Sequence, residues 1–206
     1  MKHLLMFNAL YLLLGGLYFA SKLNFEFIIY VAVIVVILGG VFGTLKYTRF
    51  PVWMLSLLSV WGLLHILGGS VQTADGVLFA YRIYPLLDLG GEFYILKYDQ
   101  FVHFYLYGVV AIMAYHLLAE RLAVEKYRNL IFLFAVTASL GVSSLNEIME
   151  FFISLTMENG VGGYENTMLD MCFNFAGALL GVFFYDRFVK RSLSVADGVV
   201  RVEKVV

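Results

Sequence analysis

Carboxylates and histidines occur inside stretches of this sequence that are otherwise apolar. Glu147 and Glu150 lie in one such stretch, Asp170 lies in another, and Asp99 and His103 open a third. A charged side chain at membrane depth costs about 2.5–3.5 kcal/mol or more, so each of these groups needs a partner or a function. Carboxylate oxygens and imidazole nitrogens bind divalent metals and also transfer protons. The residue types therefore indicate metal binding or acid–base chemistry.

The spacing of these residues predicts polar stripes along helices. Asp99, His103 and Tyr107 are separated by four residues each, so they share one face of a helix. Two more stripes follow helical spacing: Ser143, Glu147, Glu150 and Ser154, and then Asp170, Asn174, Gly177 and Gly181. The last two glycines form a GxxxG, which permits close approach of a neighbouring helix.

Six apolar stretches supply the elements that must carry these faces. Each approaches or exceeds the roughly 20 residues that a helix needs to cross a hydrocarbon core of about 30 Å. Lipid offers no hydrogen-bond partners, so spans of this length should be helical. We expect them near residues 4–20, 25–45, 50–71, 101–119, 130–157 and 167–185. The sequence therefore predicts an all-α polytopic membrane bundle of about six transmembrane helices, with one domain over 1–191 and a cytoplasmic tail over 192–206.

The composition excludes most other classes of protein. Apolar residue types make up 62% of the 206 residues and charged types 14%, against roughly 25% charged in ordinary soluble domains. So few charges cannot cover the surface of a soluble protein of this size. Cys172 is the single cysteine, which excludes an intramolecular disulfide and a thiolate metal cage. We expect membrane lipids as partners and no nucleic acid, and the oligomeric state is left open.

The distribution of Lys and Arg predicts the orientation. Eleven of the 14 lie at the N-terminus, in the second and fourth connectors or in the tail, whereas Lys22, Arg82 and Lys97 lie in the other connectors. Cytoplasmic loops carry such an excess, so both termini should face the cytoplasm from the inner (cell) membrane. The first span is expected to be retained, because its apolar run exceeds the 7–15 residues usual in a signal peptide. The connector 72–98 should form an interfacial or re-entrant segment at the outer face.

This topology places the polar residues at one depth. His65 and Glu147 lie late in spans that run outward, and Glu147 is about 25 Å along its helix at 1.5 Å per residue. Asp99 and Asp170 lie early in spans that run inward. We therefore expect one outward-facing pocket, formed by His65, Asp99, His103, Tyr107, Glu147, Glu150, Asp170 and Asn174.

Each of these residues also has a purely structural interpretation. Asp99 alone is equally well explained as a carboxylate favoured in the first turn of a helix. A lone His65 or His103 is more often a hydrogen-bonded packing residue than a ligand. The pair Glu147 and Glu150 favours function, because two acids one turn apart repel each other unless a proton, a cation or a base lies between them.

A set of ordered motifs resembles a known family. The motifs are LHILGG, KYDQFVHFYLYG, NEIMEFF and ENTMLDMCFNFAGALLG, spread over roughly residues 60–182. They are similar to those of an uncharacterised family of bacterial and archaeal inner-membrane proteins that includes YjdF, and more distantly to VanZ-like proteins. The matching residues are His65, Asp99, His103, Glu147, Glu150 and Asp170, and Asn174 is more VanZ-like. Gln100, Asn146 and Asn166 depart from the pattern, and Asn166 replaces an Asp that a two-metal site would need. The resemblance implies a membrane protein and names no reaction.

Three functions fit such a pocket. The first is a metal-dependent enzyme acting on a lipid-like or amphipathic substrate. A divalent Zn, Mn, Fe or Mg ion would then have ligands among Asp99, His103, Glu147, Glu150, Asp170 and His65, with Glu147, Glu150 and His103 as catalytic candidates. The second is a proton- or cation-coupled transporter or binding protein. The third is a structural protein whose polar cluster only fixes packing. No diagnostic metal motif and no duplicated halves occur, so the sequence favours a one-sided pocket without deciding on catalysis.

Overall fold

Six long helices dominate the computed structural model, which describes residues 1–74, 76–91, 93–156 and 162–189. Within these residues, each of the six is long and apolar enough to cross a membrane. They are α1 (Lys2–Ser21), α2 (Phe25–Gly43), α4 (Val52–Ser70), α5 (Tyr98–Ala119), α6 (Val124–Thr156) and α7 (Tyr164–Phe184). The predicted all-α membrane bundle is confirmed, and every expected span coincides with a helix. The described residues also form the short α3 (Leu45–Thr48) and the π-helical turn η2 (Tyr185–Val189).

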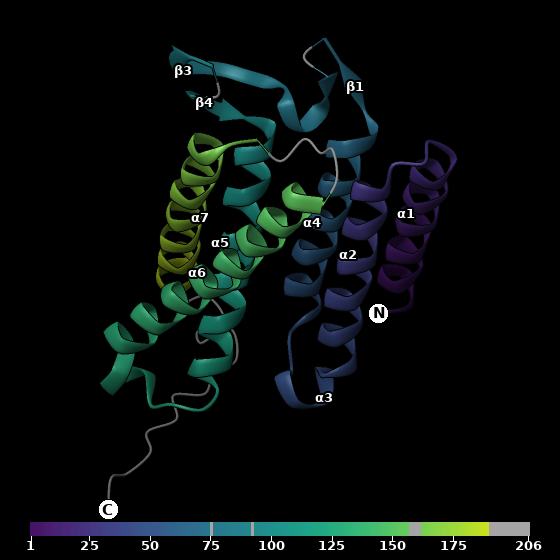
Figure 1. Cartoon of the computed structure of the whole chain (residues 1–206). Coiled ribbons are helices and arrows are strands. Elements are labelled where there is room, and N and C mark those ends of the chain that lie inside the picture. The colour runs from purple at the N-terminus through teal and green to yellow at the C-terminus, as the bar shows by residue number, and fades with distance from the viewer. Residues whose placement is uncertain (75, 92, 157–161, 190–206) are drawn as a thin grey trace, which may run out of the picture.

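Two antiparallel hairpins form the long connector between α4 and α5. β1 (Gln72–Thr73) pairs with β2 (Gly76–Val77), and β3 (Arg82–Gly90) pairs with β4 (Phe93–Lys97). The 3₁₀ turn η1 (Leu78–Ala80) lies between the hairpins. The strands lie beyond the helix ends, opposite α3 and the N-terminus (Figure 1). The connector therefore lies outside the bundle and does not pass back between the helices, which favours the interfacial alternative of the prediction over the re-entrant one.

The turn between α1 and α2 fixes where α2 begins. Leu23 adopts a left-handed conformation with φ of 52°, and the Asn24 side chain caps α2 by accepting a hydrogen bond from the Phe27 amide at 3.2 Å. Glu26 is thereby placed in the first turn of α2. Its carboxylate lies at the same end of the bundle as the hairpins.

α5 and α7 pack backbone against backbone. A Cβ atom at Gly181 would lie 2.7 Å from the carbonyl oxygen of Gly108, and one at Gly177 would overlap the Phe104 carbonyl. Only glycine allows such an approach, so the GxxxG permits the close helix contact that the sequence indicated. The contact holds the first turns of α5 and α7 side by side.

α6 runs obliquely to the other helices (Figure 1). It is joined to α5 by a buried bond in which the Ser139 hydroxyl donates to the Tyr107 carbonyl at 2.8 Å. Its opposite face exposes large apolar side chains, including Leu145 and Phe152. Exposed apolar surface of this kind is what a lipid-facing helix presents.

The start of α1 and the end of α7 lie at the same end of the bundle (Figure 1). Which end faces the cytoplasm rests on the Lys and Arg distribution and stays a prediction. The single-domain assignment over 1–191 also stays a prediction. The expected cytoplasmic tail, 192–206, lies outside the described residues.

Candidate functional site

His103 lies at the centre of the polar cluster, on α5, with 8% of its surface exposed. Its Nδ1 is 3.0 Å from Oδ1 of Asn174 on α7. The Asn174 amide nitrogen donates to the Ser143 hydroxyl at 2.8 Å, so the amide oxygen is the atom that faces His103. An amide oxygen only accepts, so Nδ1 carries a proton and donates it. The lone pair of neutral His103 is then on Nε2, where it can bind a ligand.

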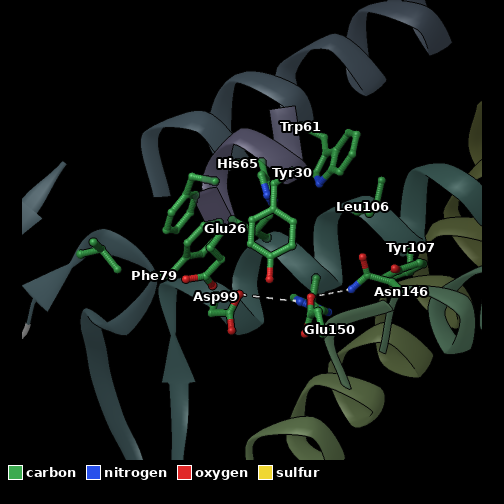
Figure 2. A pocket seen from close by; sticks show the side chains of 14 residues that line it. Glu26, Tyr30, Trp61, His65, Phe79, Asp99, Leu106, Tyr107, Asn146 and Glu150 are labelled. Atoms are coloured by element: carbon green, nitrogen blue, oxygen red, sulfur yellow. Dashed lines mark hydrogen bonds and ion pairs between the residues drawn. The ribbon is translucent and has the colours of Figure 1, made fainter. Parts of the chain in front are cut away.

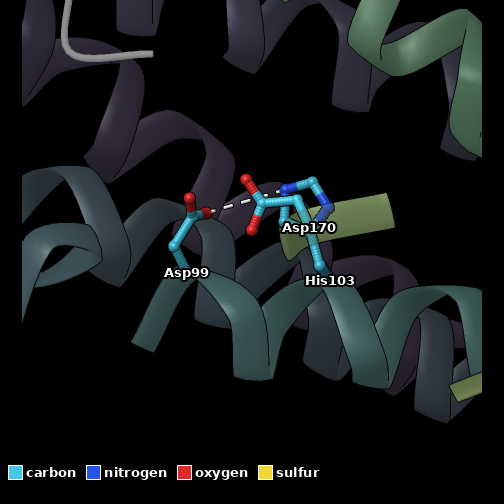
Figure 3. Close-up of side chains that lie close together, drawn as sticks. All are labelled: Asp99, His103 and Asp170. Carbon is cyan, nitrogen blue, oxygen red and sulfur yellow. Dashed lines mark ion pairs between the residues drawn. The ribbon is translucent and has the colours of Figure 1, made fainter. Parts of the chain in front are cut away.

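Asp99, His103 and Asp170 form a group with metal-binding geometry. Each offers one ligand atom, and these atoms all lie within 4.8 Å of one another. Nε2 of His103 is 3.7 Å from Oδ1 of Asp99. Asp170 is 1% exposed, and its Oδ1 has no hydrogen-bond partner among the described residues. Figure 3 shows the three side chains converging from α5 and α7.

The donor set suits a hard or borderline divalent ion. Metal–ligand distances of about 2.0–2.2 Å place tetrahedral ligands roughly 3.4 Å apart, so these atoms would have to approach one another by up to about 1.4 Å. Rotation of the two short aspartate side chains can supply this movement. One imidazole and two carboxylates, without sulfur, fit Zn, Mn or Fe and leave coordination positions for water or substrate.

A chain of two further residues orients Asp170. The Asn166 amide donates to Asp170 Oδ2 at 2.7 Å, and the Lys97 ammonium donates to Asn166 Oδ1 at 3.0 Å. The Asn166 amide therefore fixes Oδ2 of Asp170, which leaves Oδ1 of Asp170 for Asp99 and His103. From the sequence, Asn166 is only a departure from a family pattern, and Lys97 has no predicted role in the site.

Glu147 lies next to His103 but outside the three-residue group. Its side chain is 9% exposed, and Oε1 is 3.7 Å from His103 Nδ1, the nitrogen that Asn174 also contacts. Neither carboxylate oxygen has a hydrogen-bond partner among the described residues. The structure thus places Glu147 behind the imidazole, where a carboxylate can orient and support a metal-binding histidine.

A cavity of about 80 Å³ adjoins the cluster and shares Asp99 and His103 with it (Figure 2). Glu150 of α6 lines this cavity, and its Oε1 accepts a hydrogen bond from the Asn146 amide at 2.7 Å. Tyr107 also lines it and is 1% exposed. The two glutamates of α6 therefore have different surroundings: Glu147 faces the imidazole and Glu150 faces the cavity.

His65 lies in the same cavity, away from the three-residue group. Its ring centroid is 5.4 Å from that of Tyr30, 5.8 Å from that of Trp61 and 5.0 Å from that of Phe79. The structure therefore brings together Asp99, His103 and Asp170 as one ligand group and does not bring His65, Glu147 or Glu150 into it. The role of each residue stays a prediction.

Sequence reasoning missed the contribution of α2. Glu26 is 9% exposed and Tyr30 is 7% exposed, and both line the cavity. The available signal was an acid just inside an apolar run with an aromatic residue four positions later, which places both on one face. Glu26 was overlooked because it lies beside a connector, where charged residues are ordinary.

Comparison with known proteins identifies the family. The sequence model of a family described as "Predicted membrane protein (DUF2238)" matches residues 2–191. The chain belongs to this family. No curated protein and no solved structure matches the chain. Membership of DUF2238 confirms the expected uncharacterised membrane family and a multi-pass membrane location, while the distant VanZ likeness stays a prediction. The family description names no reaction, so function has to be argued from the site.

Proposed function

We propose that this DUF2238 protein binds a divalent metal ion between Asp99, His103 and Asp170 and uses it to transform a lipid-like or amphipathic substrate. The observation that carries the proposal is the convergence of three ligand atoms within 4.8 Å of one another, from a group in which Asp170 also has a buried carboxylate oxygen without a hydrogen-bond partner among the described residues. A buried polar atom left unsatisfied costs about 1–3 kcal/mol, and more when it is charged. A bound cation removes that cost.

The surrounding residues support a division of roles. A metal held by these ligands would act as a Lewis acid on a phosphoryl or carbonyl oxygen and would activate water. Asn174 and Glu147 both face Nδ1 of His103, so they are positioning residues for the ligand. Glu150 faces the cavity where a substrate would lie, so it is the candidate general acid or base.

Two observations favour a one-sided enzyme over a transporter. Between the cluster and Tyr115, α5 buries Val109, Ala111 and Met113 in the core, and residues 108–114 of this helix carry no ionisable side chain. The cavity also lies between α2 and α6, whose outer faces expose apolar side chains such as Val36 and Phe151. An amphipathic molecule in the lipid would enter the cavity laterally, between α2 and α6.

Thermal unfolding of the purified protein in detergent tests the metal site. We expect a chelator to lower the unfolding temperature of the wild type and one particular divalent ion to restore it, because the ion binds the folded state. Asp170→Asn removes a ligand charge with little change of shape and should make unfolding insensitive to the chelator. Glu165→Gln, an exposed acid on the same helix, is the matched control and should behave as the wild type. A wild-type unfolding temperature that changes neither with the chelator nor with added Zn, Mn, Fe or Mg would contradict the proposal.

A further inference from the structure

Two connectors meet at the end of the bundle opposite the hairpins. One contains α3 and the other joins α5 to α6. Nη2 of Arg121 donates to the Tyr47 carbonyl at 3.3 Å and so links the two connectors across 74 positions of the chain. Beside this contact lies a pocket with a volume of about 310 Å³. The residues that line this basic pocket are Lys46, Tyr47, Thr48, Arg49, Glu120 and Arg121.

Basic side chains dominate the basic pocket. Lys46 and Arg49 are three positions apart in the turn of α3, so they lie on the same side of it. Arg121 reaches the pocket from the other connector, and Glu120 is the single acid among the lining residues, which leaves an excess of two positive charges. Among the residues that the structure describes, none of these four groups forms an ion pair with an oppositely charged group.

Two of the three bases are already held in position. Nη1 of Arg121 donates to the Leu117 carbonyl at 2.8 Å, and Nη2 makes the bond to Tyr47. A guanidinium has five N–H donors, so Arg121 keeps donors for a ligand. The ammonium nitrogen of Lys46 lies over the Tyr47 ring, 4.6 Å from its centroid. Side chains that are positioned in advance lose less entropy when a ligand binds.

The basic pocket lies at the depth of lipid head groups. Its residues adjoin the ends of three spans, since α2 ends at Gly43, α4 begins at Val52 and α5 ends at Ala119. Tyr47 is 66% exposed, and tyrosine is enriched at this interface. The excess of Lys and Arg that orients a membrane protein can be spread over its connectors. Orientation alone therefore does not require bases from distant parts of the chain to converge on one pocket.

We propose that the basic pocket binds a phosphate group through Lys46, Arg49 and Arg121, carried by an anionic lipid head or by a small phosphorylated compound. The fork of a guanidinium matches two phosphate oxygens, and a lysine adds a point charge. Basic pockets between transmembrane helices bind such head groups in other membrane proteins. The volume would hold roughly ten water molecules of about 30 Å³ each, which leaves room for a phosphate and the atoms next to it.

This site is separate from the metal site and does not rest on the proposed function. It shares no residue with the cavity beside Asp99 and His103. A phosphate bound there would join α3 to the end of α5 through charge-assisted hydrogen bonds. Because the ligand binds the folded state, it should also raise the unfolding temperature.

Native mass spectrometry of the protein in detergent measures the binding of individual lipids. Phosphatidylglycerol is the anionic probe, and phosphatidylcholine, whose head carries a phosphate but no net charge, is its comparison. We expect one phosphatidylglycerol per chain to bind at least about tenfold more tightly than phosphatidylcholine, and high salt to weaken that binding. Equal affinities for the two lipids would overturn the inference.

Four variants assign the binding to the basic pocket. Lys46→Gln and Arg49→Gln should each weaken phosphatidylglycerol binding about fivefold, because each removes one attractive charge at the membrane surface. Glu120→Gln should strengthen the binding, because it removes a repulsive charge. Lys126→Gln, an exposed base outside the pocket at the same end of the bundle, is the matched control and should bind as the wild type. Equal losses in Lys126→Gln and Arg49→Gln would overturn the inference.

Inorganic phosphate distinguishes the two sources of the ligand. It is added to the wild type and to Arg49→Gln at constant ionic strength, with chloride as the comparison anion. If a small phosphorylated compound is the ligand, phosphate should displace phosphatidylglycerol and raise the unfolding temperature of the wild type more than that of Arg49→Gln. If a lipid head is the ligand, phosphatidylglycerol alone should do so. Either result supports the phosphate site, and no response of the wild type to either probe would overturn it.

Discussion

At the scale of single residues, Asn174 holds the imidazole of His103 in the proposed metal site. It is fully buried and connects His103 to Ser143 across α5, α6 and α7. With its nitrogen on Ser143 and its oxygen on Nδ1 of His103, the amide selects the Nδ1–H tautomer of the neutral imidazole. The availability of Nε2 is therefore set by a residue that does not itself face Asp99.

Replacing Asn174 by Leu should remove this control at nearly constant volume. We expect metal affinity to fall about 10–100-fold, as is typical when the partner of a metal-binding histidine is lost. The unfolding free energy should fall by about 1–3 kcal/mol because Ser143 and His103 lose a buried partner. Calorimetric metal titration measures the first effect. Asn174→Asp retains the acceptor for Nδ1 and should lose less affinity; a Leu variant with wild-type affinity would show that His103 is not a ligand.

Replacing Glu150 by Gln should separate catalysis from metal binding. The amide retains the shape of the side chain but cannot transfer a proton, so turnover should fall roughly 10²–10⁴-fold. Metal content should be unchanged, because Glu150 lies outside the ligand group. Mass spectrometry of products from phosphatidylcholine and phosphatidylethanolamine vesicles, incubated with each protein and the restoring ion, provides the measurement. If Glu150→Gln turns over as fast as the wild type, Glu150 is not the general acid or base.

The sequence predicted which polar residues lie close together better than it predicted how they are arranged. Helical spacing correctly grouped Asp99 with His103 and Asp170 with Asn174, because residues four apart share a face. It did not predict that Glu147 lies behind the imidazole, since spacing within one helix does not determine how that helix is rotated towards its neighbours. Such rotations depend on packing between side chains that are distant in the chain.

At the scale of elements, the site depends on the contact between α5 and α7. Gly181 brings α7 against the Gly108 carbonyl, and this approach sets the separation of Asp170 from Asp99 and His103. The GxxxG was visible in the sequence, but its partner was not. Many such pairs serve packing alone, so the motif indicates that a close contact exists and does not identify the neighbouring helix.

Gly181→Ala should therefore weaken both the fold and the site. Its Cβ would lie 2.7 Å from the Gly108 carbonyl oxygen, and overpacking of this kind costs about 1–3 kcal/mol. Gly39→Ala, where no atom lies within 4 Å of the new Cβ, should not destabilise the protein and can stabilise it by up to about 1 kcal/mol, because Ala favours the helix more than Gly does. Thermal unfolding and metal titration of the two variants give the comparison. If the two substitutions have equal effects, α5 and α7 do not pack as described.

Gln100 shows a second limit of the sequence analysis at this scale. Its side-chain oxygen accepts hydrogen bonds from the amides of Leu96 and Lys97 at 2.6 and 3.0 Å, and its nitrogen donates to the Tyr94 carbonyl at 2.8 Å. It thereby joins β4 to the start of α5, the turn that holds Asp99. The sequence predicts an interfacial or re-entrant connector without a defined secondary structure, so it does not indicate the strand that Gln100 secures.

At the scale of the whole molecule, the number of spans follows from length and hydropathy, and the pairing of helices does not. Apolar runs of about 20 residues leave the chain few alternatives in lipid. The packing of α1 against α4, where a Cβ at Gly15 would meet the Ile66 side chain, depends on complementary shapes that hydropathy does not record. The cavity, which draws on α2, α4, α5 and α6, was for this reason only partly anticipated.

The orientation of the whole molecule can be tested by cysteine labelling. In a Cys172→Ser background, a membrane-impermeant maleimide applied to intact cells should label Asp88→Cys in β3. Lys126→Cys, at the start of α6, should react only after the cells are permeabilised, because the excess of Lys and Arg keeps that end in the cytoplasm. Both positions are exposed. The reverse labelling pattern would place the pocket on the cytoplasmic side.

Elemental analysis of the purified protein tests the metal site most directly. After growth with Zn, Mn, Fe and Mg supplied, the wild type and Glu165→Gln should carry about one divalent ion per chain, held by His103, Asp99 and Asp170. Asp170→Asn, purified in the same way and still folded by thermal unfolding, should carry far less. Equal metal in the wild type and in Asp170→Asn, whether high or negligible, would contradict the account.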